Sequence, residues 1–340
     1  LNIMRFIGWK NFLIEGCKVF YNNYFKTCPT ENFESLAEYR YGSKIAKLFL
    51  INYSEKLWGM QAKKLSTEIS GKRLKGLSLH TLLIELLFGK AKKTKHLDGS
   101  FLYPKFGIGT LFEKLSEEVG LKNINLKKTI TKIYHNNFEI KSIEINNREI
   151  KNISNVITTI PIDIFVKQLS PPPPSEIQNL IQKIKYRNII LIAFFLNKKT
   201  INRNGSMYFP SKDIPFTRIY EPRNRSKNMS PKNKTSLIVE LPCFNEDKYW
   251  KAKDEKISQE IQKKLISIGL INKTDIINSK IYKIKNAYPV LECDFKNKVQ
   301  PLLDYLAKFN NLKVSGRNGL FAYTHIHDQF INARHIISYK

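Results

Sequence analysis

The sequence predicts a mixed α/β protein, in which helices and strands both contribute to the core. Apolar residues recur at three- and four-residue spacing over residues 1–100, which is the period of an amphipathic helix. After residue 128 the period falls to two, which is typical of strands with one buried face. From residue 175 onward, helical and strand-like blocks alternate, and this alternation favours a fold of mixed class.

The helical pattern of the first hundred residues is clearest at 44–58 and 78–90. A loop rich in proline and glycine follows, in the stretch FLYPKFGIG. We expect Thr110 to cap a helix over 111–119, which Gly120 ends.

Three short segments with strand periodicity follow, TITKIY, FEIKSIEI and NVITTI. Asn146 and Asn147 stand between the second segment and the residues that follow it, and paired asparagines suit a tight hairpin turn. We therefore predict a small antiparallel meander made of these segments.

The second half of the chain begins with a stiff connection, SPPPPSEI, because proline fixes the backbone and prevents helix formation before Ser175. The apolar run IILIAFFL is typical of a buried strand. Ile257, Ile261, Leu265 and Ile268 share one face of a predicted helix that Gly269 ends. The remaining expected elements are a helix to residue 185, strands within 206–243, a strand at 281–285, a helix at 299–309 and a last strand at 311–316.

The composition indicates a folded chain with a strongly basic surface. Hydrophobic residues make up 42% of the 340 residues, which excludes global disorder, and the formal net charge is +28. Such a charge suits nucleic acid, an anionic membrane surface or a phosphate-bearing ligand. The lysines are scattered and no RNA-binding signature is present, so we expect a basic ligand pocket and no nucleic-acid partner.

Cysteine usage and hydropathy favour a cytoplasmic protein. The four cysteines form no CxxC pair, which argues against a zinc site or a disulfide framework. The sequence contains no apolar run of the roughly 20 residues that a membrane span needs, and no signal peptide. Peripheral contact with a membrane stays open.

Near the C-terminus, SGRNGLFAYTHIHDQF has the form of a phosphate-binding turn, with Gly316 and Gly319 on either side of an arginine. No GxGxxG lies between a strand and a helix anywhere in the chain, so the usual dinucleotide fingerprint is missing. His325 and His327 form an H-x-H pair, but no third ligand is suggested nearby, and we expect no metal.

These segments, in their order, resemble the flavin-containing amine oxidase superfamily. The closest resemblance is to its bacterial branch of protoporphyrinogen-oxidase-like amine oxidoreductases, and UDP-galactopyranose mutase is a more distant relative. The resemblance runs over essentially the whole chain, through YSEKLWGMQAKKLS, GKRLKGLSL, FLYPKFGIGTLFEKL, NVITTIPIDIF, TRIYEPRN, ELPCFNEDKYW, NAYPVLECDF and GRNGLFAY.

The resemblance implies two domains that are each built from separate stretches of chain. Residues 101–165 and 289–340 would supply the middle and C-terminal segments of a discontinuous FAD-binding domain. Residues 1–100 and 166–288 would form the helices and the mixed or antiparallel sheet of a substrate domain. The family's first Rossmann unit would precede Leu1. We therefore expect a C-terminal fragment, half of a split gene with a separate Rossmann partner, or a degenerate paralogue, and poor FAD binding by this chain alone.

The resemblance also implies which residues lie near ligands. Those expected at the cofactor FAD are Ile130, Thr159, Pro161, Gly316, Arg317, Asp328, Gln329 and Phe330. Candidates for the substrate pocket are Trp58, Tyr103, Arg218, Tyr220 and His325. No residue is indicated as a catalytic base.

The implied activity is that of an FAD-dependent oxidoreductase, in which the flavin accepts a hydride while protein groups orient the substrate. The alternatives are a flavin-dependent isomerase that resembles the sugar-nucleotide mutase, and a non-catalytic remnant without flavin. The substrate would be a small molecule, a lipid or a nucleotide sugar.

Overall fold

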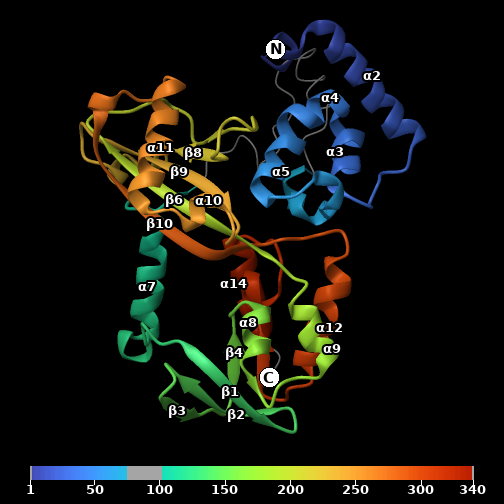
Figure 1. Cartoon of the computed structure of the whole chain (residues 1–340), viewed down its shortest axis with the longest axis vertical. Coiled ribbons are helices and arrows are strands. Elements are labelled where there is room, and N and C mark those ends of the chain that lie inside the picture. Colours follow the sequence, from blue (N-terminus) through green and yellow to red (C-terminus); the bar gives the residue numbers. More distant parts are fainter. Residues whose placement is uncertain (1, 75–101, 339–340) are drawn as a thin grey trace. The chain divides into compact units, whose positions relative to one another are not determined.

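The computed structural model describes residues 2–74 and 102–338 (Figure 1). The chain divides into two compact units, and each unit is assembled from separate stretches of sequence. The first unit contains residues 1–118 and 187–285, and the second contains 119–186 and 286–340. The assignment of the predicted FAD and substrate domains to these stretches stays a prediction.

The N-terminal part of the first unit is helical, as predicted. Asn32 caps α3 by accepting a hydrogen bond from the Ser35 amide at 2.9 Å. The predicted helix over 44–58 is present, but a π-helical turn interrupts it, and the predicted helix over 78–90 lies outside the described residues. The elements are α1 (Asn2–Ile7), α2 (Trp9–Phe25), α3 (Phe33–Tyr41), α4 (Ser43–Ile45), η1 (Ala46–Ile51), α5 (Asn52–Trp58), η2 (Ala62–Lys64) and η3 (Thr67–Leu74).

The rest of the first unit is a five-stranded sheet with the order β10-β6-β9-β8-β7. β6 and β9 pair antiparallel over nine residues, from Asn188 opposite Cys243 to Leu196 opposite Thr235. The predicted amphipathic helix is α11, whose Ile257, Ile261 and Leu265 are fully buried in the same core cluster as the sheet. The strands are β6 (Tyr186–Leu196), β7 (Met207–Tyr208), β8 (Arg218–Tyr220), β9 (Thr235–Cys243) and β10 (Ile276–Pro289), and the helices are α10 (Lys248–Lys251) and α11 (Asp254–Ser267).

A helix of the first unit, α7 (Gly109–Val119), corrects one expectation. It begins before Thr110, so Thr110 lies inside the helix and does not cap it. Gly107, at φ 100°, makes the turn into the helix, and its carbonyl accepts the Thr110 amide at 3.2 Å. Among the described residues, no helix is long and apolar enough to cross a membrane.

The second unit holds the predicted hairpin, in a sheet with the order β3-β2-β1-β5. β1 (Ile130–Asn136), β2 (Glu139–Ile145) and β3 (Glu149–Asn152) are antiparallel neighbours, and β5 (Leu169–Ser170) adds in parallel to β1. Asn146 and Asn147 form the β2–β3 turn with φ of 54° and 58°. Positive φ at both central residues is the requirement of a type I′ hairpin, so this turn is confirmed.

The third predicted strand of the meander has another partner. β4 (Val156–Thr158) leaves the meander and pairs in parallel with β11 (Leu312–Val314), the last strand of the chain. The Asn311 side chain joins the two sheets: its Oδ1 accepts from the Ile140 amide, and its Nδ2 donates to the carbonyls of Ile140 and Ser154. The helices of this unit are η4 (Leu121–Asn123), α8 (Ile162–Lys167), α9 (Ser175–Ile181), α12 (Phe295–Ala307), α13 (Gly316–Gly319) and α14 (Ile326–Ser338).

Candidate functional site

The candidate cofactor site lies in the second unit, where β4 and β11 end side by side. Both strands run in the same direction, so their carboxyl ends meet at one edge, and ligands of open parallel sheets bind at such edges. The Ser315 amide donates to the Thr158 carbonyl at 2.8 Å and ties the two strand ends together. Thr159 and Pro161 follow β4, and Gly316 and Arg317 follow β11, so four of the predicted cofactor residues are at this edge.

Gly316 adopts φ 78°, a conformation that favours glycine. A Cβ at this position would lie 2.9 Å from the Cβ of Thr159 and 3.1 Å from its Cγ2. The glycine is therefore required by the close approach of the two strand-end loops within the protein.

The Arg317 side chain turns back onto its own turn. Its Nε and Nη2 donate to the Thr324 carbonyl at 3.2 and 2.6 Å, and its Nη1 reaches the Ala287 carbonyl at 3.5 Å. The guanidinium also lies over the rings of Tyr288 and Tyr323, at 5.4 and 5.2 Å from their centroids. Its main contacts therefore close the segment 317–324 into a fixed loop.

The residues predicted at the start of the closing helix hold that start in place. Asp328 accepts from the His325 amide at 2.8 Å, and Gln329 donates to the Thr324 hydroxyl at 2.6 Å. The rings of His325 and His327 stack at 5.7 Å, and Phe330 is 44% exposed. In the described residues, no group of three or more His, Cys, Asp or Glu side chains is placed to hold a metal ion.

Ile130 lies elsewhere in the second unit, at the start of β1 and outside the β4–β11 pair. Its carbonyl accepts the Gln168 side-chain amide at 2.5 Å. The structure thus gives this carbonyl a partner within the protein.

Two polar residues that sequence reasoning missed belong to the strand-end edge. Asp163, in the first turn of α8, and Asn318, in α13, each have a buried Oδ1 for which residues 2–74 and 102–338 supply no hydrogen-bond partner. The Tyr186 hydroxyl donates to the Asn318 carbonyl at 3.1 Å, and burial, with a contribution from the Asp163 charge, raises the pKa of this phenol. Burial raises the pKa of Asp163, and the Lys167 ammonium partly offsets that effect.

These features fit the hydroxyl-bearing part of a dinucleotide. Two oxygen acceptors without donors suit ribose or ribityl hydroxyls and not phosphate oxygens, which are themselves acceptors. Parallel strand ends and a positive-φ glycine suit the close approach of backbone to such a ligand. No sequence pattern marked Asp163 or Asn318, because burial without a donor depends on the folded neighbours.

A second cluster of predicted residues lies in the first unit, on β8. Arg218 makes two hydrogen bonds to the Glu240 carboxylate, one from Nε at 2.9 Å and one from Nη2. Burial opposes the charge of Arg218, but the bonds to Glu240 raise its pKa overall. The Tyr220 ring centroid lies 5.6 Å from the guanidinium of Arg218 and 4.6 Å from that of Arg225. Burial raises the pKa of Tyr220, Glu240 and Tyr103 add to this effect, and the two arginines oppose it.

Trp58 differs from the other substrate-pocket candidates because its side chain is only 2% exposed. Residues next to Trp58 in the sequence, and the side chains that bond to them, fix the local structure. Lys56 Nζ donates to the carbonyls of Ser211 and Ile214 at 2.8 and 2.9 Å, and burial lowers the pKa of Lys56 to about 8. The buried Arg187 donates to the carbonyls of Lys56, Leu57 and Pro242 and pairs with Asp247 at 3.2 Å.

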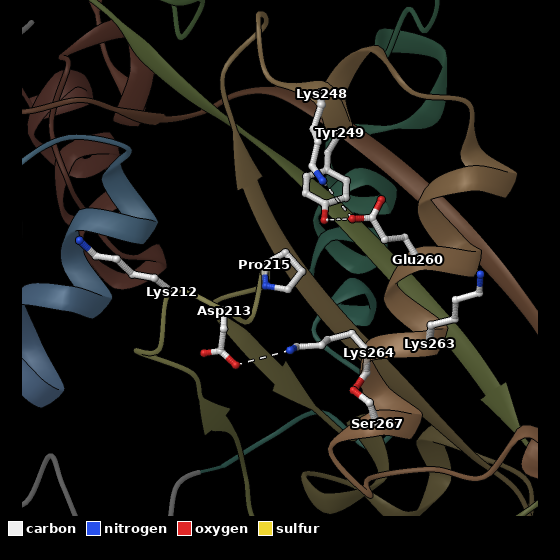
Figure 2. A pocket seen from close by; sticks show the side chains of 9 residues that line it. All are labelled: Lys212, Asp213, Pro215, Lys248, Tyr249, Glu260, Lys263, Lys264 and Ser267. Atoms are coloured by element: carbon white, nitrogen blue, oxygen red, sulfur yellow. Dashed lines mark hydrogen bonds and ion pairs between the residues drawn. The ribbon is translucent and has the colours of Figure 1, made fainter.

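The first unit also contains an open hollow of about 590 Å³ beside α10 and α11 (Figure 2). Its acids are already bound, because Glu260 accepts from Tyr249 and Lys248, and Asp213 pairs with Lys264. None of the predicted site residues lines this hollow. Its lining residues are Lys212, Asp213, Pro215, Lys248, Tyr249, Glu260, Lys263, Lys264 and Ser267.

The comparisons with known proteins define a member of the flavin-containing amine oxidase superfamily. A family model for UDP-galactopyranose mutase matches residues 48–266, and the chain belongs to that family. The superfamily predicted from the sequence is thereby confirmed.

Solved structures show the same fold. The structure of reduced UDP-galactopyranose mutase has a TM-score of 0.75 and 21% identity, over 90% of this chain and 67% of that one. A proposed protoporphyrinogen oxidase from Exiguobacterium sp. 255-15 has a TM-score of 0.70 and 14% identity, over 96% of this chain and 70% of that one. Putrescine oxidase bound to putrescine has a TM-score of 0.54 and 14% identity, over 85% of this chain and 64% of that one.

Proposed function

We propose that this protein is part of a flavin-dependent enzyme that isomerises the sugar of a nucleotide-linked substrate. The observation that carries the proposal is the charge around Tyr220, where two guanidinium groups lie beside the ring and only that of Arg218 is bonded to a carboxylate, Glu240. Membership of the UDP-galactopyranose mutase family supports the same conclusion.

The charge balance distinguishes between substrate classes. Arg218 is engaged by Glu240 through two hydrogen bonds, whereas within the described part of the chain Arg225 makes one long bond, to the Ser206 hydroxyl at 3.4 Å. Arg225 therefore keeps most of its donors for a ligand, and a guanidinium suits a diphosphate. A cationic amine would be repelled by the same group, which disfavours an amine substrate here.

The cofactor we propose is FAD, held at the β4–β11 edge. The backbone at Thr159 and Gly316 would lie against it, and the free acceptors of Asp163 and Asn318 would receive its hydroxyl groups. A bound flavin supplies hydride acceptance when oxidised and a nucleophilic nitrogen when reduced. Arg317 acts indirectly, because it closes the loop that carries the glycine turn.

An FAD-dependent oxidoreductase is the second candidate. The fold likeness to the proposed protoporphyrinogen oxidase favours it, and a basic cluster would also suit the carboxylates of a porphyrinogen. An amine oxidase is disfavoured by the same cluster.

Binding and turnover separate the candidates. We expect UDP to bind the chain in calorimetry and putrescine not to bind. With excess FAD and dithionite, UDP-galactopyranose should convert to the furanose form, as separated by chromatography. The Arg225→Gln variant should weaken UDP binding by about 10- to 150-fold, because one charge-assisted hydrogen bond is worth about 1.5–3 kcal/mol. The matched control is Arg203→Gln at an exposed arginine, which should leave binding unchanged.

Peroxide release from putrescine or from protoporphyrinogen in air, without any UDP binding, would overturn the isomerase proposal. Equal UDP affinity in the Arg225→Gln variant and the wild-type chain would overturn the assignment of the anion site.

A further inference from the structure

Helix α2 belongs to the helical N-terminal part of the first unit (Figure 1), and many of its large apolar side chains are exposed. Phe12, Glu15 and Val19 form its buried side, at 2–5% exposure. The opposite side is mostly aromatic, and its large side chains are 52–70% exposed. They are Trp9, Leu13, Ile14, Phe20, Tyr21, Tyr24 and Phe25. We call this surface the α2 aromatic face.

The rings of the α2 aromatic face are already arranged in contact with one another. Phe20 and Tyr24 lie 4.5 Å apart, and Tyr21 and Phe25 stack at 5.2 Å. Phe6 of α1, 71% exposed, extends the surface to Phe49 at 5.9 Å. Exposed apolar surfaces of this extent in folded proteins are typical of interaction sites.

The rotation of α2 is fixed by a buried acid. Glu15 accepts from Lys18 at 2.9 Å and from the Lys44 amide at 3.2 Å, at the start of α4. Gly42 leaves room for this carboxylate, because a Cβ there would collide with it. The aromatic face is therefore held away from the core by hydrogen bonds and not left exposed by a loose helix.

The charges along α1 and α2 are almost all positive. Glu15 is the one acid in the two helices, and it is buried and paired. Arg5, Lys10, Lys18 and Lys26, on or next to these two helices, are exposed, and Lys10 lies among the side chains of the α2 aromatic face. The whole chain adds a formal charge of +28, which strengthens attraction to an anionic surface.

We propose that the α2 aromatic face binds an anionic lipid bilayer and lies in its interface. Exposed tryptophan, tyrosine and phenylalanine on one face, together with exposed lysine and arginine, are features of helices that lie in the plane of a membrane surface. A second copy of the chain would bring the same cations against each other, so an anionic surface is the better electrostatic complement.

Co-sedimentation with vesicles tests the proposal. Vesicles of phosphatidylcholine with about a third phosphatidylglycerol should bind the chain, and pure phosphatidylcholine should bind it at least about tenfold less. The variant Leu13→Gln/Phe20→Gln/Tyr24→Gln should lose about tenfold or more in partitioning, because three exposed apolar side chains no longer enter the interface. The matched control, Ile277→Gln/Tyr282→Gln/Ile284→Gln, changes three side chains of 42–50% exposure on β10 and should bind as the wild type does.

Trp9 provides an independent signal, because it is 61% exposed while Trp58 is 2% exposed. Vesicles should shift the tryptophan emission to shorter wavelength, and Trp9→Phe should abolish most of that shift while binding persists. Absence of vesicle binding by the wild-type chain would overturn the proposal. Equal loss in the control variant would overturn the assignment to α2. A dimer in light scattering that the α2 variant dissociates, without lipid binding, would assign the face to a second copy.

Discussion

Replacing Gly316 by alanine should destabilise the second unit, because two separate costs arise at one atom. The glycine adopts φ 78°, where an L side chain is strained. The new Cβ would also lie 2.9 Å from the Thr159 Cβ, and the optimum separation for two carbon atoms is about 3.5–4.0 Å.

The magnitude follows from these two costs. The left-handed backbone costs about 1–2 kcal/mol for a residue with a Cβ. Overpacking of a close contact adds about 1–3 kcal/mol, so Gly316→Ala should lose about 2–5 kcal/mol of unfolding free energy. Gly269→Ala is the matched control, since its φ is 73° and no atom lies within 4 Å of its added Cβ. It should lose only the backbone part, about 1–2 kcal/mol.

Each unit can be followed by its own signal during urea unfolding. Trp9, Trp58 and Trp250 are the only tryptophans of the chain, and all three belong to the first unit. Their fluorescence should therefore report Gly269→Ala and not Gly316→Ala. Hydrogen exchange of peptides that contain β4 and β11 should report Gly316→Ala.

A second substitution tests the steric part alone. Thr159→Gly removes the Cβ that the alanine meets and should restore most of the overpacking loss in the double variant. Equal destabilisation by Gly316→Ala and Gly269→Ala, or no restoration by Thr159→Gly, would refute the assigned contact.

Three further predictions concern single side chains. Arg187→Met should lower the unfolding free energy by about 1–3 kcal/mol, because it leaves three carbonyls without their buried donor, while the half-exposed Asp247 can turn to water. Arg203→Met at an exposed site should change the unfolding free energy little, and urea unfolding followed by fluorescence measures both variants. Burial lowers the pKa of Lys56 to about 8 from 10.5, so between these pH values the unfolded chain holds a proton that the folded chain lacks. Stability of the wild type relative to Lys56→Met should therefore rise with pH across this window, and a flat difference would contradict the burial. Asn147→Gly should raise the free energy of unfolding by about 0.5–1 kcal/mol, and the melting temperature slightly, because glycine tolerates the φ of 58° better. Asn147→Val should lower both quantities.

The parts of the fold that were predictable from the sequence depend on local spacing. The face of Ile257, Ile261 and Leu265 repeats along one helix, and all three side chains are fully buried. The Asn146-Asn147 turn needs only its two residues and the strands on either side. Such features require no knowledge of distant parts of the chain.

The partner of β4 was not predictable in this way. Its period-two pattern suits a third meander strand equally well, but it pairs with β11, which follows more than 150 residues later. The Asn311 side chain, which bonds to Ile140 and Ser154, secures this arrangement. A single polar anchor of this kind has no periodicity, so no pattern in the sequence marks it.

The candidate site shows the same limit at the level of single atoms. A glycine followed by an arginine, at a strand end, suggests an anion ligand, yet the Arg317 guanidinium is directed to the Thr324 carbonyl. Other acceptors are unsatisfied at this edge, since the Oδ1 atoms of Asp163 and Asn318 are buried without donors in the described part of the chain. Because both are acceptors, they select for hydroxyl or amide hydrogens and against phosphate. Recognition at this edge therefore depends on which polar atoms the fold leaves unsatisfied, and residue types alone do not specify that.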